Sequence, residues 1–145
     1  MEMEYIELHA ASAFSFLAGA SQPEALIERA AELEMPALAL SDRNGVYGAA
    51  RFHTMARKTG VRALIGAEIA VRSFGEQLTP QEWLPHQFPS EPPRVLLLCA
   101  SQVGYQNLCQ LVTRFKMREP GKAEGAATIE DLEEFSWTDL PHWRR

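Results

Sequence analysis

A regular alternation of strand and helix patterns is the feature that most constrains how this chain can fold. Strands are indicated at 5–9, 37–40 and 61–71, and helices are indicated between them, at about 21–34 and 47–59. The segment 37–40 is continuously apolar, which is typical of a strand buried on both faces of a parallel sheet. A β-α-β-α-β order favours parallel strands joined by right-handed crossovers. The sequence therefore predicts an α/β fold.

Local signals indicate where the first expected helix begins and which face it buries. Ser21 precedes Glu24 by three residues, the spacing of a capping box in which each side chain satisfies a backbone amide that the helix leaves free. Leu26, Ala30 and Leu33 recur at helical spacing, so they are expected to form the buried stripe. The loop ahead of this helix is expected to be held down by three apolar side chains, those of Phe14, Phe16 and Leu17.

The alternating pattern is interrupted after the third strand and then resumes. Residues 72–94 hold five prolines and few periodic apolar positions, so we interpret them as a long surface loop inserted into one domain. A strand at 95–99 follows, and then a helix at 101–117 whose first residue is a capping serine. Its inward side chains are expected to be Val103, Leu108, Leu111, Val112 and Phe115. Thr128 with Asp131 indicates a further capped helix.

Charge and apolar content argue against several functional classes. The 145 residues carry a formal net charge of -5, whereas domains that coat nucleic acid usually carry a basic excess that displaces phosphate counterions. We interpret the basic cluster Arg114, Lys116, Arg118 and Lys122 as a solvated helix end. No apolar run approaches the roughly 20 residues of a membrane span, and the acidic N-terminus is not a secretory signal. The two cysteines have no metal-binding spacing, which fits reduced thiols of a cytoplasmic protein.

Three expected strands carry a potential metal ligand near their carboxyl ends. His9 ends the first strand, Asp42 follows the second, and Glu68 lies in the third. Ligands of β/α barrels and open α/β sheets bind beyond such strand ends, and imidazole and carboxylate groups suit zinc or manganese. The same residues also have structural interpretations, as a hydrogen-bonded histidine, a turn-forming aspartate and a solvated glutamate. The pattern alone leaves both interpretations open.

Four segments in the same order resemble one protein family. They are ELHAASAFSFLAGAS (7–21), PALALSDRNGVYGAARFH (36–53), IGAEI (65–69) and GYQNLCQLVTRFKMREPGK (104–122). Together they are similar to the N-terminal PHP (polymerase and histidinol phosphatase) domain of C-family bacterial DNA polymerases, and most similar to the error-prone branch. The resemblance implies a partial distorted β/α barrel, like a TIM barrel, truncated after its first strands and helices. Residues 1–145 would form the N-terminal portion, with a Pro-rich insertion at 72–94.

The resemblance also implies a metal site, and this sequence retains only part of it. Active members end the first strand in His-x-His, but Ala11 stands in place of the second histidine, and Ala18 in place of an aspartate of the next loop. Arg43 stands where active members have a histidine at the end of the second strand. The retained family positions, interpreted as a vestigial metal site, are His9, Asp42 and Glu68.

These replacements lower the expectation of metal chemistry. Alanine supplies no donor atom, and a guanidinium is permanently charged and cannot ligate a cation. We therefore expect no catalytic or cofactor-binding residue, and at most a weakly bound zinc, manganese or magnesium ion. One hypothesis is that Arg43 takes the place of a metal and joins the retained carboxylates, Asp42 and Glu68, in one salt-bridged network.

Three functions follow as expectations. The first is a non-catalytic structural portion of an error-prone DNA polymerase, whose family role is DNA-directed synthesis in DNA replication, repair and translesion synthesis. Its partners would be the rest of the polymerase chain, DNA through the full-length protein, and accessory damage-tolerance proteins. The alternatives are a stand-alone metal-dependent PHP phosphoesterase and a free-standing binding protein. The chain is expected to be a fragment or a truncation, inactive alone, and its exposed sheet edges are expected to cause self-association.

Overall fold

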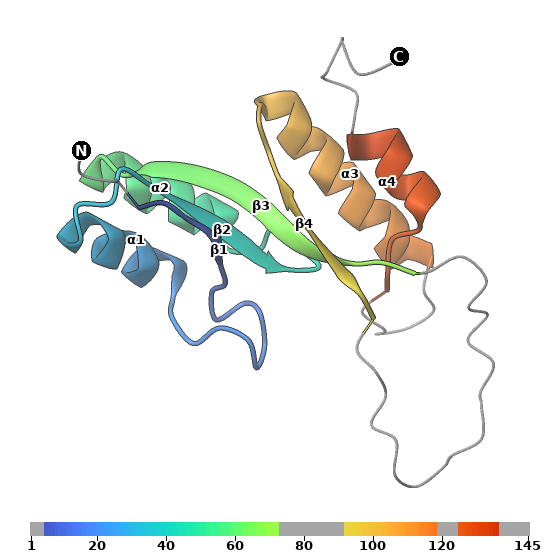
Figure 1. Cartoon of the computed structure of the whole chain (residues 1–145), viewed down its shortest axis with the longest axis horizontal. Coiled ribbons are helices and arrows are strands. Elements are labelled where there is room, and N and C mark those ends of the chain that lie inside the picture. Colours follow the sequence, from blue (N-terminus) through green and yellow to red (C-terminus); the bar gives the residue numbers. More distant parts are fainter. Residues whose placement is uncertain (1–4, 73–91, 119–124, 137–145) are drawn as a thin grey trace, which may run out of the picture.

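The sheet that organises this chain has its four strands in sequence order, β1-β2-β3-β4 (Figure 1). The computed structural model describes residues 5–72, 92–118 and 125–136. The strands are β1 (Glu7–Ala10), β2 (Ala37–Arg43), β3 (Arg62–Ala70) and β4 (Arg94–Leu98). The first three strands pair in parallel, whereas β4 pairs antiparallel with β3. The predicted α/β fold with parallel strands in its first half is therefore confirmed.

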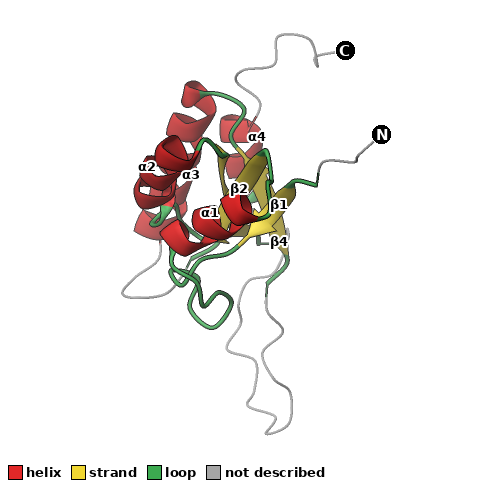
Figure 2. Cartoon of the chain, turned by 90° about the vertical axis from the view of Figure 1, so that its left-hand side faces the viewer, coloured by secondary structure: helices red, strands yellow, loops and turns green. Residues whose placement is uncertain are grey.

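The helices lie together on one face of the sheet. They are α1 (Pro23–Glu32), α2 (Ala49–Thr59), α3 (Gln102–Arg118) and α4 (Ile129–Ser136). α1 and α2 pack over β2 and the first half of β3, while α3 and α4 pack over the second half of β3 and over β4 (Figure 2). The sheet curls like part of a barrel wall, and no described helix covers its inner face, which faces the reader in Figure 1. In the described part of the chain, no helix is both long and apolar enough to cross a membrane.

Period-two alternation decides which side chains reach each face of the sheet. In β2, Leu38 and Leu40 point toward α1 and α2 and join a buried cluster with Phe52. In β3, Ala67 and Ile69 pack against α3. Successive side chains of a strand point to opposite faces, so the residues at the intervening positions point to the inner face.

The start of α1 differs from the predicted capping box. The helix begins at Pro23, and its N-cap residue, Gln22, makes no side-chain capping bond. Glu24 does not reach back toward Ser21 but accepts a hydrogen bond from Arg51 Nε on α2, at 2.5 Å. A hydrogen bond between two charged groups is about twice as strong as one between neutral groups, so the tertiary pair wins over the local cap.

The buried stripe of α1 is also only partly as predicted. Ile27 and Ala30 are buried, whereas Leu26 is half-buried and Leu33 is half-exposed. Leu33 is the C-cap residue, just after the last helical residue. Helical spacing no longer applies at the C-cap. Leu33 therefore does not lie on the buried side of α1, although the sequence pattern places it there.

Both predicted caps in the C-terminal half are confirmed. Ser101 Oγ accepts a hydrogen bond from the Gly104 amide at 3.1 Å, at the start of α3. Thr128 and Asp131 cap α4 reciprocally. The Asp131 amide donates to Thr128 Oγ1 at 3.3 Å, and the Thr128 amide donates to Asp131 Oδ2 at 2.9 Å. These caps depend only on residues close in sequence, which is why local pattern finds them.

The inner side of α3 agrees with prediction except at its first turn. The buried residues of this helix are Leu108, Leu111 and Phe115, and Val112 is partly buried. Val103, at the first turn, is half-exposed. Most of the predicted insertion at 72–94 falls outside the described residues, so that prediction, like the assignment of 1–145 to one domain portion, stays a prediction.

Candidate functional site

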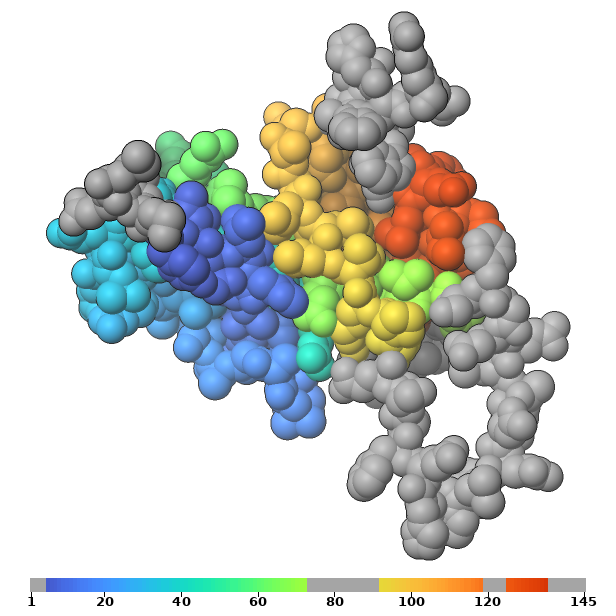
Figure 3. Space-filling view, viewed as in Figure 1, coloured from blue at the N-terminus to red at the C-terminus, as the bar shows by residue number. Residues whose placement is uncertain are grey.

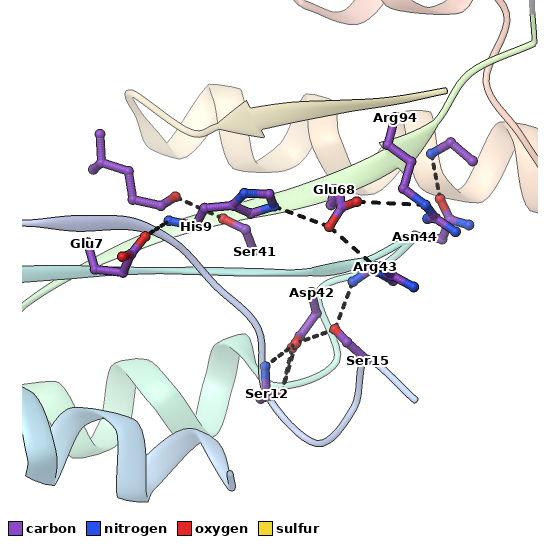
Figure 4. A network of polar contacts seen from close by, with 12 residues as sticks. Glu7, His9, Ser12, Ser15, Ser41, Asp42, Arg43, Asn44, Glu68 and Arg94 are labelled. Carbon is purple, nitrogen blue, oxygen red and sulfur yellow. Dashed lines mark hydrogen bonds and ion pairs between the residues drawn. The ribbon is translucent and has the colours of Figure 1, made fainter. Parts of the chain in front are cut away.

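The carboxylate of Glu68 lies at the centre of a polar cluster on the inner face of the sheet (Figure 4). His9 Nε2 lies 3.2 Å from Glu68 Oε2, and Arg43 Nε lies 3.8 Å from the same oxygen. Arg94 Nε lies 3.7 Å from the other oxygen, Glu68 Oε1. Side chains from all four strands therefore meet at a single carboxylate. Of the three sequence-predicted ligands, His9 and Glu68 are brought together.

Strand register explains why these side chains meet. Arg43 on β2 is the register partner of Glu68 on β3, so the two side chains lie side by side on the same face. On β4, Arg94 pairs with Ala70, two residues along β3 from Glu68. This diagonal spacing is within reach of a long side chain. Sequence reasoning missed Arg94, because its contribution depends on the antiparallel direction of β4.

Asp42 does not belong to this cluster. It follows Leu40 at the same parity, so its carboxylate points toward the helix-covered face and is only 1% exposed. Ser12 donates to its Oδ1 through both the amide, at 2.7 Å, and Oγ, at 2.9 Å, and Ser15 Oγ donates to the same oxygen at 2.7 Å. The expectation of one network joining Asp42 and Glu68 is therefore wrong, because neighbouring strand residues face opposite sides.

The loop between β1 and α1 is held by these serines. Ser12 and Ser15 are buried, and Ser15 Oγ also accepts a hydrogen bond from the Arg43 amide at 3.0 Å. The apolar side chains at the loop tip are not anchors: Phe16 is 82% exposed and Leu17 is 91% exposed. The loop projects below the sheet edge, as the blue segment in Figure 3 shows. The loop is held in place by serine hydroxyl groups that bond to a buried carboxylate. A search for apolar anchors does not reveal this.

The donor set does not fit a metal cluster of the family type. Within the described ranges, no group of three or more His, Cys, Asp and Glu side chains is placed to hold a metal ion. His9 and Glu68 could supply two donor atoms, but Asp42 faces away and is satisfied by serines. Arg43 and Arg94 add two permanent positive charges beside Glu68, and these would repel a divalent cation. We therefore assign no metal-dependent step to this site.

The other acidic residue at the start of β1 is engaged elsewhere. Glu7 accepts hydrogen bonds from the Tyr5 hydroxyl at 2.5 Å and from the His9 amide at 2.7 Å. Both hydrogen bonds hold the pKa of the Glu7 carboxyl below its ordinary value, and the bond from Tyr5 has the larger effect. The Glu7 carboxylate is therefore occupied by donors at the beginning of β1.

A groove of about 460 Å³ lies on the opposite face, between α2 and α3. Its walls include His53, Ile65, Cys99 and Tyr105. Burial, with a smaller contribution from Cys109, raises the pKa of the Cys99 thiol to about 11. A thiol that stays protonated at neutral pH is a poor nucleophile, so Cys99 is not an activated nucleophile in this groove.

The basic residues of α3 are engaged with side chains of this chain. Arg114 forms an ion pair with Glu134, and Arg118 Nη2 lies 2.7 Å from Asp131 Oδ1. Lys116 contacts the ring of Tyr47. These contacts favour the predicted solvated helix end over a dedicated contact to DNA for these three residues. The fourth residue of the predicted cluster, Lys122, lies outside the described residues.

The relatives that comparison with known proteins finds are DNA polymerases. The chain is 44% identical over 110 residues to the error-prone DNA polymerase of Anaeromyxobacter sp. (strain K), a match that covers 76% of this chain and 9% of that protein. It is 34% identical over 142 residues to the error-prone DNA polymerase of Corynebacterium efficiens, covering 98% of this chain and 11% of the relative. It is also 37% identical over 113 residues to the DNA polymerase III subunit alpha of Buchnera aphidicola. The chain thus spans about a tenth of the length of these relatives.

Solved structures share the fold at lower identity. An amidohydrolase from Chromobacterium violaceum, solved with bound sulfate and no metal, is 23% identical with a TM-score of 0.52 and covers 77% of this chain and 33% of its own. A Bifidobacterium adolescentis protein assigned to the metal-dependent phosphoesterases is 17% identical, with a TM-score of 0.51 and the same coverage. The PHP domain family matches residues 7–140. On this match and on its curled α/β sheet, the chain belongs to the PHP domain family.

Proposed function

We propose that this chain is a non-catalytic, structural portion of the PHP domain of an error-prone DNA polymerase. The observation that carries the proposal is that both strand-end carboxylates are already engaged by other groups of this chain. Glu68 is bound by two arginines, and Asp42 is bound by two serines. The names of the relatives support the polymerase context.

The cluster has a clear structural use. Glu68 joins strands that are up to three positions apart in the sheet, because His9 comes from β1 and Arg94 from β4. An isolated surface ion pair contributes only about 0–1 kcal/mol, but Glu68 and Arg94 are largely buried. Removing one partner of a buried pair leaves an uncompensated charge and is considerably more costly. The cluster therefore stabilises the end of the sheet where active members would use a metal.

In the whole protein, DNA-directed DNA synthesis would be carried out by other parts of the polymerase. Its context would be DNA replication, repair and translesion synthesis in the cytoplasm. The remaining polymerase chain would be the principal partner, DNA would be contacted through the full-length protein, and accessory damage-tolerance proteins would be further partners. Reading the DNA downstream of the codon for Arg145 tests this context. An open reading frame that continues into a polymerase supports it, and a stop codon favours a free-standing binding protein.

A stand-alone metal-dependent phosphoesterase is the second candidate. It is favoured by the 3.2 Å approach of His9 Nε2 to Glu68 Oε2, which could hold one weak ion, and by the phosphoesterase among the structures of similar fold. The positive charges of Arg43 and Arg94 oppose it.

Metal analysis and a phosphatase assay decide between the two candidates. Purified protein should contain far less than one equivalent of zinc or manganese and should not hydrolyse a phosphate monoester with added Mn²⁺. Stoichiometric metal, together with Mn²⁺-dependent hydrolysis that is lost in E68Q, would overturn the structural role. E28Q, which removes an exposed carboxylate of α1, is the matched control.

A further inference from the structure

We propose that the groove between α2 and α3 binds a flat nitrogen heterocycle whose edge carries a hydrogen-bond donor beside an acceptor, a chemical class that includes lactams and several nucleobases. The heterocycle would pair with the backbone of Ala63 on β3, which lines the groove. The groove lies on the face of the sheet opposite Glu68. The inference therefore goes beyond the proposed function and does not depend on it.

Hydrogen bonds on either side of Ala63 show which way its backbone groups point. The Arg62 amide donates to the Pro36 carbonyl at 3.0 Å, toward β2. The Ile65 carbonyl accepts from the Cys99 amide at 2.8 Å, toward β4. The backbone groups of successive strand residues point alternately to the two sides of the strand. Ala63 lies two residues before Ile65, so its N–H and C=O point to the side of β4.

Strand β4 ends before it reaches Ala63. Its last register pair is Leu98 with Gly66, and the chain then turns into α3, which begins at Gln102. Among the described residues, none donates to or accepts from the backbone of Ala63 on this side. An unpaired strand edge is ready to bind a matching group. One donor and one acceptor, close together and pointing the same way, are therefore presented to the groove.

The groove around these two groups has the size and the lining of a ligand site. Its volume of about 460 Å³ falls in the range of roughly 300–1,000 Å³ that is usual for small-molecule sites. The small or apolar side chains of Ala49, Ala63 and Ile65 line it, and Tyr105 supplies an aromatic ring. Burial, followed by a hydrogen bond with Cys109, raises the pKa of the Tyr105 hydroxyl. The ring therefore stays neutral and can stack on a flat ligand.

The lining also restricts the charge of the ligand. None of the twelve described residues that line the groove carries a carboxylate, although the chain as a whole has a formal net charge of -5. His53, Arg62 and Gln102 provide the polar side chains of the rim. A cationic heterocycle would find no counter-charge there, so a neutral or anionic one is favoured.

An extended peptide is the other partner that an unpaired strand edge can accept. In the described part of β3, Ala63 is the residue that lies beyond the end of β4 on this side. A peptide would therefore gain only the two backbone bonds of Ala63. A heterocycle gains the same two bonds and also stacks on Tyr105, which is why we favour it.

Amide chemical shifts of the isotope-labelled full chain, followed during titration with the bicyclic lactam isocarbostyril, test the proposal. Saturable shifts centred on the amides of Ala63 and Ile65 are expected. N-methylisocarbostyril lacks the N–H donor and should bind about tenfold more weakly, because the Ala63 carbonyl is left without a partner. Absence of binding, or equal affinity for the two compounds, would overturn the proposal. Equal binding of N-acetylalanine N-methylamide would assign the edge to a peptide instead.

Filling the groove provides the matched test on the side of the protein. Ala50→Trp adds a large side chain at an exposed position of the groove wall and should abolish lactam binding. Thr54→Trp adds the same side chain at an exposed position of α2 outside the groove and should match wild type.

Circular dichroism melts show whether the variants are folded. If Ala50→Trp is not folded, Tyr105→Ala replaces it and should weaken lactam binding several-fold through loss of stacking. Unchanged lactam affinity in a folded Ala50→Trp or Tyr105→Ala variant would overturn the site. The proposed structural role is tested separately, by metal content and Mn²⁺-dependent hydrolysis, so failure of the two proposals can be told apart.

Discussion

A buried carboxylate can be stabilised by neutral hydroxyl groups when several of them converge on it, and Asp42 is held in this way. Its oxygens accept hydrogen bonds from the Ser12 amide and from the hydroxyls of Ser12 and Ser15. Several donors that converge in this way satisfy the oxygens of a buried carboxyl group. At Asp42, the loop and β2 are joined by hydrogen bonds from two serines, and no cation is required.

Replacing Ser15 with alanine should destabilise the chain by about 1–3 kcal/mol, because it removes a donor to Asp42 and an acceptor for the Arg43 amide. Urea denaturation followed by circular dichroism measures the free energy of unfolding. Ser21→Ala is the matched control, since Ser21 is exposed and forms no cap for α1. Its effect should stay within about 0.5 kcal/mol. Equal losses in the two variants would contradict the role given to Ser15.

Leu17 should be replaceable by glycine with a gain in stability. Its φ of 61° lies in the left-handed region, which disfavours residues that carry a Cβ atom. The side chain is 91% exposed, so its loss sacrifices little buried surface. We expect Leu17→Gly to stabilise the chain by up to about 1 kcal/mol. Leu17→Ala should be near neutral because the Cβ atom remains. Comparing the unfolding midpoints of the two variants checks this, and a destabilised glycine variant would argue against strain.

At the scale of helices and strands, the features that depend on neighbouring residues could be predicted from sequence. The capping pair of Thr128 and Asp131 was one of them. The cap expected at Ser21 was not formed, because Arg51, distant in sequence, takes the glutamate. Only the tertiary arrangement of α1 and α2 reveals that competitor.

The candidate site could be predicted only in part, for reasons that lie in the strands. Segment 37–40 is apolar on both faces, so the sequence shows no alternation of apolar and polar residues. It therefore does not indicate which face of the sheet Asp42 reaches and which face Arg43 reaches. His9 and Glu68 were correctly placed together because parallel strand ends meet. The contribution of Arg94 required the direction of β4, which the long preceding insertion leaves undetermined.

The cap of α4 should make stability depend on pH. Burial would raise the pKa of Asp131, but the Arg118 guanidinium and the Thr128 backbone amide more than offset burial and hold this pKa below its ordinary value. A carboxyl with a lowered folded pKa contributes stability above its unfolded pKa, and that stability is lost as pH falls through the folded pKa. Asp131→Asn should therefore cost about 1–2 kcal/mol at pH 7, and the difference should shrink below about pH 4. Denaturation at both pH values measures it, with the exposed Glu130→Gln as control; a constant difference would contradict this account.

At the scale of the whole molecule, the sheet leaves two sides without cover in the described residues. β1 pairs only with β2, and the inner face carries no helix. Phe16 and Leu17 add exposed apolar surface at the tip of the loop. Unpaired strand edges and exposed apolar residues both promote association.

The isolated chain should therefore self-associate as its concentration rises. Sedimentation velocity over a hundredfold range of concentration measures this, and Phe16→Ser should reduce the association without changing the melting temperature appreciably. Thr113→Ser, at an exposed position of α3, provides a neutral control. A monodisperse monomer at all concentrations, with a sharp high-temperature melt, would contradict the expectation.

The bonds of Asp42 to Ser12 and Ser15 also have a consequence for how such sequences can diverge. A change at either serine alone removes a hydrogen bond to the buried Asp42 carboxylate, and a change of Asp42 alone leaves two buried hydroxyls without this acceptor. Each single step is unfavourable, so substitutions at these three positions should accumulate together. In an alignment of many related sequences, Ser12, Ser15 and Asp42 should covary as one unit, and His9 should vary independently of them.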